Sequence, residues 1–234
     1  MTPSHRFERL LLICPHPDDE TLAAGILLQN AVALGADVRV VYLTNGESNA
    51  LPQLAVEKRW PRSKKDRDRW GAIRQDEARA ALRTLGVMGE PEFWNLPDQG
   101  LAALIAGDGI GVTRRLQELV KSFRPTLIVT PSRRDLHSDH VAAEAIVARV
   151  SVPHLVYMVH GAPIPAGEGF TPDHWPELIE RKQLALQCHA TQLRLSRRRM
   201  LELARREERY LPHDLDGSPP SMRRLKRLPP IFLR

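Results

Sequence analysis

The 234-residue chain has few of the features that mark disulfide-rich, membrane-spanning or nucleic-acid-binding proteins. Its two cysteines, Cys14 and Cys188, are too few for a disulfide framework. No apolar run approaches the roughly 18 residues of a transmembrane helix, and the N-terminus carries no cleavable signal pattern. Aromatic residues make up only 5% of the chain, too few for the stacking surfaces that single-stranded nucleic acids require. We therefore expect a cytoplasmic protein that does not bind nucleic acid.

Glycine-rich phosphate-binding motifs are also missing. The sequence contains neither GxGxxG nor GxxxxGK[ST], which argues against a dinucleotide or nucleoside triphosphate site. What is present is ordinary globular composition, with 42% hydrophobic and 26% charged residues. The length fits a single hydrophobic core.

Positive charge is concentrated in two stretches of a chain whose formal net charge is +6. Residues 194–234 contain 12 basic and 5 acidic residues, and residues 57–74 contain 8 basic and 3 acidic residues. Such stretches fit either a solvated face or contact with phosphate groups or an anionic membrane surface. The C-terminal stretch is the candidate for peripheral membrane contact.

Short apolar runs alternate with longer amphipathic segments, which is typical of a doubly wound α/β domain. The pattern predicts a mostly parallel sheet with helices on both faces, followed by a basic helical and extended C-terminal tail. Residues 1–195 form the expected core domain, and residues 196–234 a tail that belongs to it. We expect a loop over 57–74, helical structure over 196–211 and an extended arm from about Pro212. The expected strands are 9–14, 37–46, 91–97, 125–132 and 154–161, and the expected helices are 21–35, 73–86, 110–123, 175–190 and one from near His140.

Two polar clusters follow predicted strands: PHPDDE at 15–20 and RDLHSDH at 134–140. In doubly wound sheets, ligands bind beyond the carboxyl ends of the strands, where the strand order reverses. The adjacent carboxylates of the first cluster require a positive partner, and a divalent cation meets that need. Two histidines and a carboxylate, with water in the fourth position, are a frequent catalytic zinc set.

A reactive metal site also needs a base that does not bind the metal. Asp18 is the candidate for this base, and Glu20 is expected to brace the turn. One of His137 and His140 is expected to bind the metal. The other, protonated, would stabilise an oxyanion or protonate the leaving group, oriented by Asp139 or Asp135. Spacing alone leaves the choice between the two histidines open.

The residues His16-Pro17-Asp18-Asp19-Glu20 and His137-Ser138-Asp139-His140 resemble the signature of the PIG-L/LmbE family of zinc-dependent de-N-acetylases. TNGE at 44–47, LPDQG at 96–100 and RKQLALQCHATQ at 181–192 follow in family order. The resemblance covers residues 8–195 and implies a Rossmann-like fold. It also implies hydrolysis of the N-acetyl group of an amino sugar, usually an N-acetylglucosamine unit.

The resemblance further implies a role for each matching residue. His16, Asp19 and His140 correspond to the zinc ligands, and Asp18 corresponds to the general base. His137 corresponds to the group that stabilises the oxyanion and assists amine departure, and Asp139 to its acidic partner. Residues that fall where relatives contact sugar hydroxyls are Glu47, Arg74 and Asp98.

Several alternatives stay open at this stage. A metal-dependent phosphoesterase, or a non-catalytic protein that binds an anionic glycolipid, would also fit the charge distribution. Iron would compete with zinc for the same ligands. Arg74 and Glu77 also fit a plain pair on a helix surface, and His160 fits either the site or a structural position. The sugar is undetermined, and a phosphorylated, lipid-linked or nucleotide-linked form would suit the basic stretches.

Overall fold

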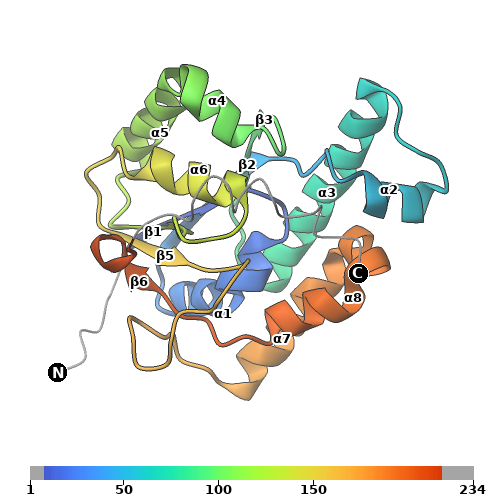
Figure 1. Ribbon diagram of the computed structural model, residues 1–234. Helices are drawn as coiled ribbons and strands as arrows, with labels where there is room; N and C mark the ends of the chain where they lie inside the picture. The colour runs from blue at the N-terminus through green and yellow to red at the C-terminus, as the bar shows by residue number, and fades with distance from the viewer. Residues whose placement is uncertain (1–7, 218–234) are drawn as a thin grey trace.

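A six-stranded sheet in the order β3-β2-β1-β4-β5-β6 forms the centre of the molecule (Figure 1). The computed structural model describes residues 8–217. Strands β1 to β5 are parallel, and β6 runs antiparallel to β5. The strands are β1 (Arg9–Cys14), β2 (Asp37–Thr44), β3 (Glu92–Leu96), β4 (Leu127–Pro131), β5 (His154–Tyr157) and β6 (Leu211–Pro212).

Helices cover both faces of this sheet (Figure 1), which confirms the doubly wound architecture. Along β1, Leu10 and Leu12 pack into a core with α1, α3, α7 and α8, whereas Leu11 and Ile13 pack into a second core with α4, α5 and α6. The split follows from the alternation of side chains along a strand. The helices are α1 (Asp19–Ala33), α2 (Ala50–Glu57), α3 (Lys64–Thr84), α4 (Leu101–Asp108), α5 (Ile110–Phe123), α6 (Ser138–Val147), α7 (Pro176–Cys188) and α8 (Ala190–Ala204). Among these helices, none combines the length and apolar composition that a membrane span requires.

The strand order reverses between β1 and β4, the two central strands. From β1 the chain continues to β2 and β3 on one side, and from β4 it continues to β5 and β6 on the other. Leu10 of β1 lies opposite Leu127 of β4 in a parallel pairing, so the carboxyl ends of both strands open at the same edge. The two polar clusters of the sequence therefore meet at the switch point of the sheet.

Most predicted elements are confirmed, two of them to the residue. β1 and α5 have the predicted bounds, and α1 begins at Asp19, two residues before the predicted start. Gly35 follows α1 with φ +75°, a backbone conformation that glycine adopts without strain. The buried Cys14 packs into the core next to α1.

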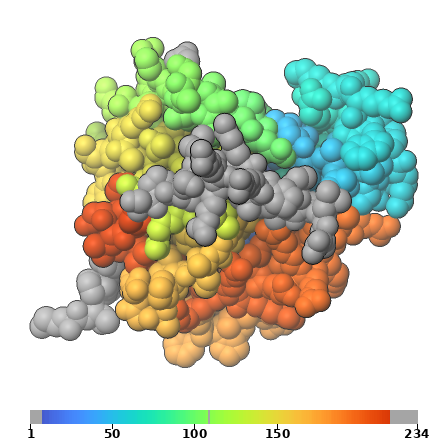
Figure 2. Space-filling view, in the orientation of Figure 1, coloured from blue at the N-terminus to red at the C-terminus, as the bar shows by residue number. Residues whose placement is uncertain are grey.

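The predicted loop over 57–74 is wrong, because α3 already begins at Lys64. The Ser63 hydroxyl accepts the backbone N–H of Asp66, and the Asp66 carboxylate accepts that of Ser63, which forms a capping box. With α2, the first turns of α3 form a lobe that projects from one side of the molecule (Figure 2). Within this lobe, Arg59 and Arg69 form ion pairs with acidic side chains, so part of the basic charge is balanced locally.

Two further differences concern segments without a clear periodic pattern. Helix α4 was not predicted, and the helix expected over 196–211 ends at Ala204. Leu211 and Pro212 instead pair with β5 as a short antiparallel strand. Most of the extended arm predicted from about Pro212 lies outside the described residues.

A buried ionic network attaches the segment after α8 to the middle of α1. The ammonium of Lys182 lies 2.7 Å from the carboxylate of Glu208, and both side chains are almost fully buried. Glu208 also accepts the backbone N–H groups of Ile26 and Leu27. Because Asp19 and Glu20 lie in the first turn of α1, this network stabilises the helix on which the site is built.

Lys182→Met is expected to lower the free energy of unfolding by about 3–5 kcal/mol, because Glu208 would remain buried without its cation. Urea unfolding followed by circular dichroism measures this loss. The matched control is Lys121→Met at an exposed lysine of α5, which should change stability little. Equal unfolding midpoints for the two variants would contradict the prediction.

Candidate functional site

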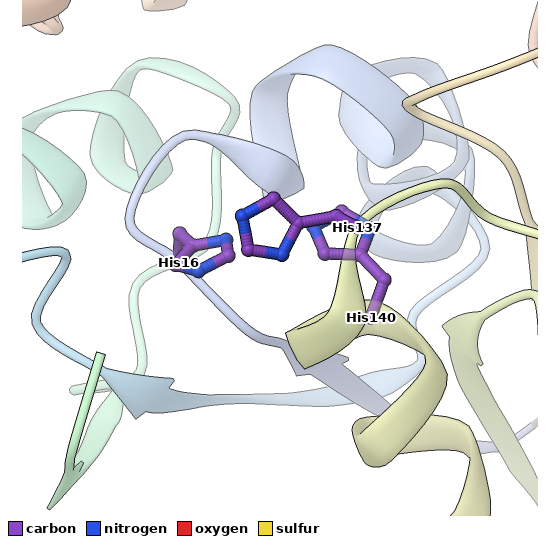
Figure 3. Close-up of side chains that lie close together, drawn as sticks. All are labelled: His16, His137 and His140. Atoms are coloured by element: carbon purple, nitrogen blue, oxygen red, sulfur yellow. The ribbon is translucent and has the colours of Figure 1, made fainter. Parts of the chain in front are cut away.

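His16, Asp19 and His140 meet at the carboxyl ends of β1 and β4. The distance from His16 Nδ1 to Asp19 Oδ2 is 3.5 Å, and that from His140 Nε2 to Asp19 Oδ1 is 3.4 Å. Each distance is close to the roughly 3.4 Å that separates two ligand atoms of a tetrahedral ion, and the two distances involve different oxygens of Asp19. Figure 3 shows the imidazoles of His16, His137 and His140 close together, with the ring of His137 between the other two in this view. Nitrogen atoms of these three histidines lie within 4.8 Å of one another.

The electrostatics of this cluster also fit a divalent metal ion. Burial disfavours a charged imidazole, yet the carboxylates of Asp135 and Asp19 raise the pKa of His140 to about 10. The pKa of His16 is likewise raised, because Asp139, Asp19 and Asp98 outweigh its burial. Neither ring nitrogen of His140 makes a hydrogen bond to the described residues. The buried carboxylates thus require positive charge, which protons on the histidines or a metal ion can supply.

Asp135 connects the second polar cluster to the end of β5. One carboxylate oxygen accepts the backbone N–H of His137, and the other accepts those of Val159 and His160. The latter oxygen also lies 3.2 Å from His140 Nδ1. A carboxylate on the second nitrogen of a ligating histidine fixes the orientation of its ring. Asp135 was only an alternative in the sequence, since DLHSDH offers two aspartates near the histidines.

Asp18, the predicted base, occupies a strained turn. Its φ of 143° is rare for a residue with a side chain. The backbone N–H of Asp18 donates to Glu20 Oε2, which confirms that Glu20 braces this turn. Burial raises the pKa of Asp18 to about 6, against the lowering effect of Arg74. A carboxylate with such a pKa is ionised at neutral pH and is suited to accept a proton.

The other oxygen of Glu20 contacts His189, a residue that sequence reasoning did not assign to the site. Oε1 of Glu20 lies 2.7 Å from His189 Nε2 and accepts the hydroxyl of Thr21. His189 is fully buried at the start of α8, and Glu20 raises its pKa against the effect of burial. The only signal for His189 in the sequence was its place in the RKQLALQCHATQ segment.

His137 lies beside the metal cluster, but its environment differs from the expectation. The backbone N–H of Asp139 donates to His137 Nδ1 over 3.2 Å, so a neutral ring carries its proton on Nε2. Burial and the nearby His16 and His140 lower the pKa of His137 to about 4. The metal-free site therefore favours a neutral ring, and the protonated His137 expected from the sequence stays a prediction. A neutral imidazole still offers its Nε2–H as a donor.

The carboxylate of Asp139 lies against His16 instead of His137. Asp139 Oδ2 is 3.4 Å from His16 Nε2 and accepts the backbone N–H of Gln99. Asp98 Oδ1 lies 3.2 Å from the same nitrogen of His16. The two aspartates hold the ring of His16 with Nδ1 on the side of Asp19. The contact of Asp139 with His137 is made by its backbone N–H alone.

The residues predicted to contact the sugar, Glu47, Arg74 and Asp98, make most of their contacts within the protein. Glu47 accepts the backbone N–H groups of Asp98 and Asn45, and Asp98 Oδ2 accepts that of Ser48. The side chain of Arg74 is only 4% exposed, which excludes the alternative of a surface pair with Glu77. Contacts of these residues with a sugar stay a prediction.

His160 lies at the site, next to both histidines of the second cluster. Its ring centroid is 5.5 Å from that of His137 and 5.0 Å from that of His140. Burial lowers the pKa of His160 to about 3, which keeps the ring neutral. Of the two readings of His160, the structure therefore favours the one that places it in the site.

Asp135→Asn should weaken metal binding by about 10-fold to 100-fold, because the carboxamide cannot reproduce the carboxylate on His140 Nδ1. Metal affinity is measured by competition with a chromophoric chelator. Asp76→Asn, at an exposed position of α3, is the control and should bind as the wild type does. Wild-type affinity in Asp135→Asn would contradict this role.

Metal binding should release protons from His16 and His140 and weaken as the pH falls. Both pKa values are raised in the metal-free site, so protons compete with the ion for these nitrogens below the raised values. Calorimetry in buffers of different ionisation enthalpy measures the number of protons released. Binding without proton release at pH 7 would show that the histidines are neutral before the ion arrives.

Comparison with known proteins agrees with this geometry. The family profile of GlcNAc-PI de-N-acetylases, PIG-L, matches residues 11–151. A 1D-myo-inositol 2-acetamido-2-deoxy-alpha-D-glucopyranoside deacetylase from Mycolicibacterium vanbaalenii is 30% identical, over 71% of this chain and 66% of that protein. Its counterpart from Mycobacterium sp. (strain KMS) is 29% identical, over 79% of this chain and 74% of that protein.

Solved structures share the fold at low sequence identity. An N,N'-diacetylchitobiose deacetylase from Pyrococcus horikoshii matches with a TM-score of 0.67 and 18% identity, over 93% of this chain and 88% of that one. A 4-carboxy-2-hydroxymuconate hydratase from Pseudomonas putida matches with a TM-score of 0.60 and 19% identity, over 84% and 82%. The fold is thus shared by proteins named for different reactions, and the family assignment rests on the profile match. The chain belongs to the PIG-L family of GlcNAc-PI de-N-acetylases.

Proposed function

We propose that this protein is a zinc-dependent hydrolase that removes the N-acetyl group from an N-acetylglucosamine-type amino sugar in a glycoconjugate. The observation that carries the proposal is that adjacent residues of the turn after β1 point to different partners. One group contributes to a cluster of potential metal ligands, and the other is a carboxylate outside that cluster. His16 and Asp19, with His140, form a donor set that fits a tetrahedral ion, and Asp18 lies between them in sequence but contacts Arg74. Relatives named as deacetylases of acetamido sugars support the choice of substrate class.

Zinc, with its preference for nitrogen and oxygen ligands in tetrahedral geometry, suits the donor set of two histidines and one aspartate. When bound there, the ion would polarise the acetyl carbonyl and lower the pKa of water. His16 would bind through Nδ1, because Asp98 and Asp139 lie on Nε2. His140 would bind through Nε2, because Asp135 lies on Nδ1.

In the proposed reaction, Asp18 and His137 have different tasks. Asp18 accepts the proton of the attacking water, for which its pKa of about 6 in the metal-free site suits it. The Nε2–H of neutral His137 donates to the oxyanion that develops on the acetyl oxygen. His137 also assists departure of the amine, which leaves with the proton that Asp18 took from the attacking water. A non-catalytic glycolipid-binding protein would have no use for a strained carboxylate kept beside the ligands, which favours an enzyme.

Asp18→Asn should keep zinc but lose about 100-fold to 10,000-fold of kcat, because the amide cannot accept the proton. Free amine is measured by mass spectrometry with a 1D-myo-inositol acetamido-glucopyranoside, N,N'-diacetylchitobiose and phosphorylated, lipid-linked and nucleotide-linked N-acetylglucosamine. Zinc content is measured on the same samples, and Asp76→Asn serves as the control.

Two results would overturn the proposal. One is the absence of amine release by the zinc-loaded wild type with every substrate of the panel. The other is undiminished turnover in Asp18→Asn.

A further inference from the structure

The resemblance assigns Arg74 to the sugar, but its side chain is buried among backbone atoms of two turns. Its Nη1 donates to the carbonyl of Gly46 over 3.0 Å, and its Nη2 donates to the carbonyl of Pro17. Nη2 also donates to Asp18 Oδ2 over 3.0 Å. With 4% of the side chain exposed, a sugar hydroxyl has little of the guanidinium to reach.

The position of the Arg74 side chain explains why residue 46, in the TNGE segment, is a glycine. Gly46 has φ +62°, and a Cβ atom built on it would lie 1.5 Å from Arg74 Nη1. A side chain at position 46 would therefore occupy the place of the guanidinium. The turn after β2 thus has a shape that admits this arginine between itself and the turn after β1.

From these contacts we infer that Arg74 is a positioning residue, which holds the carboxylate of Asp18 for proton transfer instead of binding the sugar. Three acceptors on two turns fix the planar guanidinium, a geometry that a lysine ammonium cannot reproduce. The same side chain holds both the carboxylate of Asp18 and the carbonyl before it, so it restrains the strained backbone at φ 143° as well as the reacting group. The inference rests on the proposed role of Asp18 as the base.

A positioning role predicts that substitution of Arg74 affects kcat and KM differently. Arg74→Ala should lower kcat by about 100-fold with KM nearly unchanged, because a misplaced catalytic group costs about this much. Added guanidinium or methylguanidinium at millimolar concentration should restore kcat in Arg74→Ala at least about 10-fold by filling the space of the lost group. Arg74→Lys should also lose kcat and should not be rescued.

Gly46→Ala provides a second variant that leaves the arginine in the sequence. It should show the same loss of kcat at unchanged KM, and guanidinium should not rescue it, because the added methyl group occupies the site. Arg79→Ala, a partly exposed arginine on the same helix, is the matched control and should behave as the wild type. Melting temperature and zinc content, measured on every variant, separate this effect from unfolding or metal loss.

Hydrogen exchange gives a readout that does not depend on the substrate. The amides of Thr21 and Leu22 donate to the carbonyl of Asp18, so their exchange reports on the turn. We expect faster exchange there in Arg74→Ala, reversed by guanidinium.

Three results would overturn the inference. The first is a raised KM with unchanged kcat, which would show that Arg74 binds the sugar. The second is loss of zinc or folding without rescue, and the third is wild-type exchange at Thr21 and Leu22 in Arg74→Ala. If wild-type protein released no amine, the proposed function would fail separately, and the exchange result would still decide whether Arg74 holds the turn.

Discussion

The structure of this site depends on a concentration of buried negative charge where β1 and β4 end. Asp19, Asp98, Asp135 and Asp139 are all buried, and each contacts His16 or His140. Each of the four also accepts at least one backbone N–H. A carboxylate removed from water costs several kcal/mol unless such partners compensate for the lost hydration. The backbone donors supply part of that compensation, and positive charge on protonated histidines or on a metal ion can supply the rest.

This arrangement separates the proposed metal-binding groups from the proposed proton-transferring group within one turn. Asp19 begins α1 with its carboxylate on the histidines, whereas Asp18 precedes the helix with its carboxylate on Arg74. The unusual backbone of Asp18 makes that divergence of adjacent side chains possible. Glu20, His189 and Arg74 hold the turn from three different segments. Strain of this kind persists only where the surroundings fix it from several sides.

The fold was predictable from the sequence where local patterns and packing agree. The continuous apolar run at 9–14 and the amphipathic periodicity at 110–123 are both clear signals, and both elements were found with their bounds. The start of α3 was missed because a run of basic residues obscured the capping box at Ser63 and Asp66. Strand β6 has two residues, too few for any periodic signal, and it exists because the edge of β5 is available for pairing.

For the site, the sequence by itself determined which residue types gather and at which edge of the sheet, because both clusters directly follow strands that neighbour each other. It also determined that Asp19 and the histidines are of the kind that bind a metal. Only the tertiary structure decided which aspartate lies against which histidine, that burial lowers the pKa of His137, and that Arg74 is buried against Asp18. Those properties depend on desolvation and on charges contributed by distant segments, such as the loop before Asp98 and the turn at His160. Sequence spacing carries no information about either.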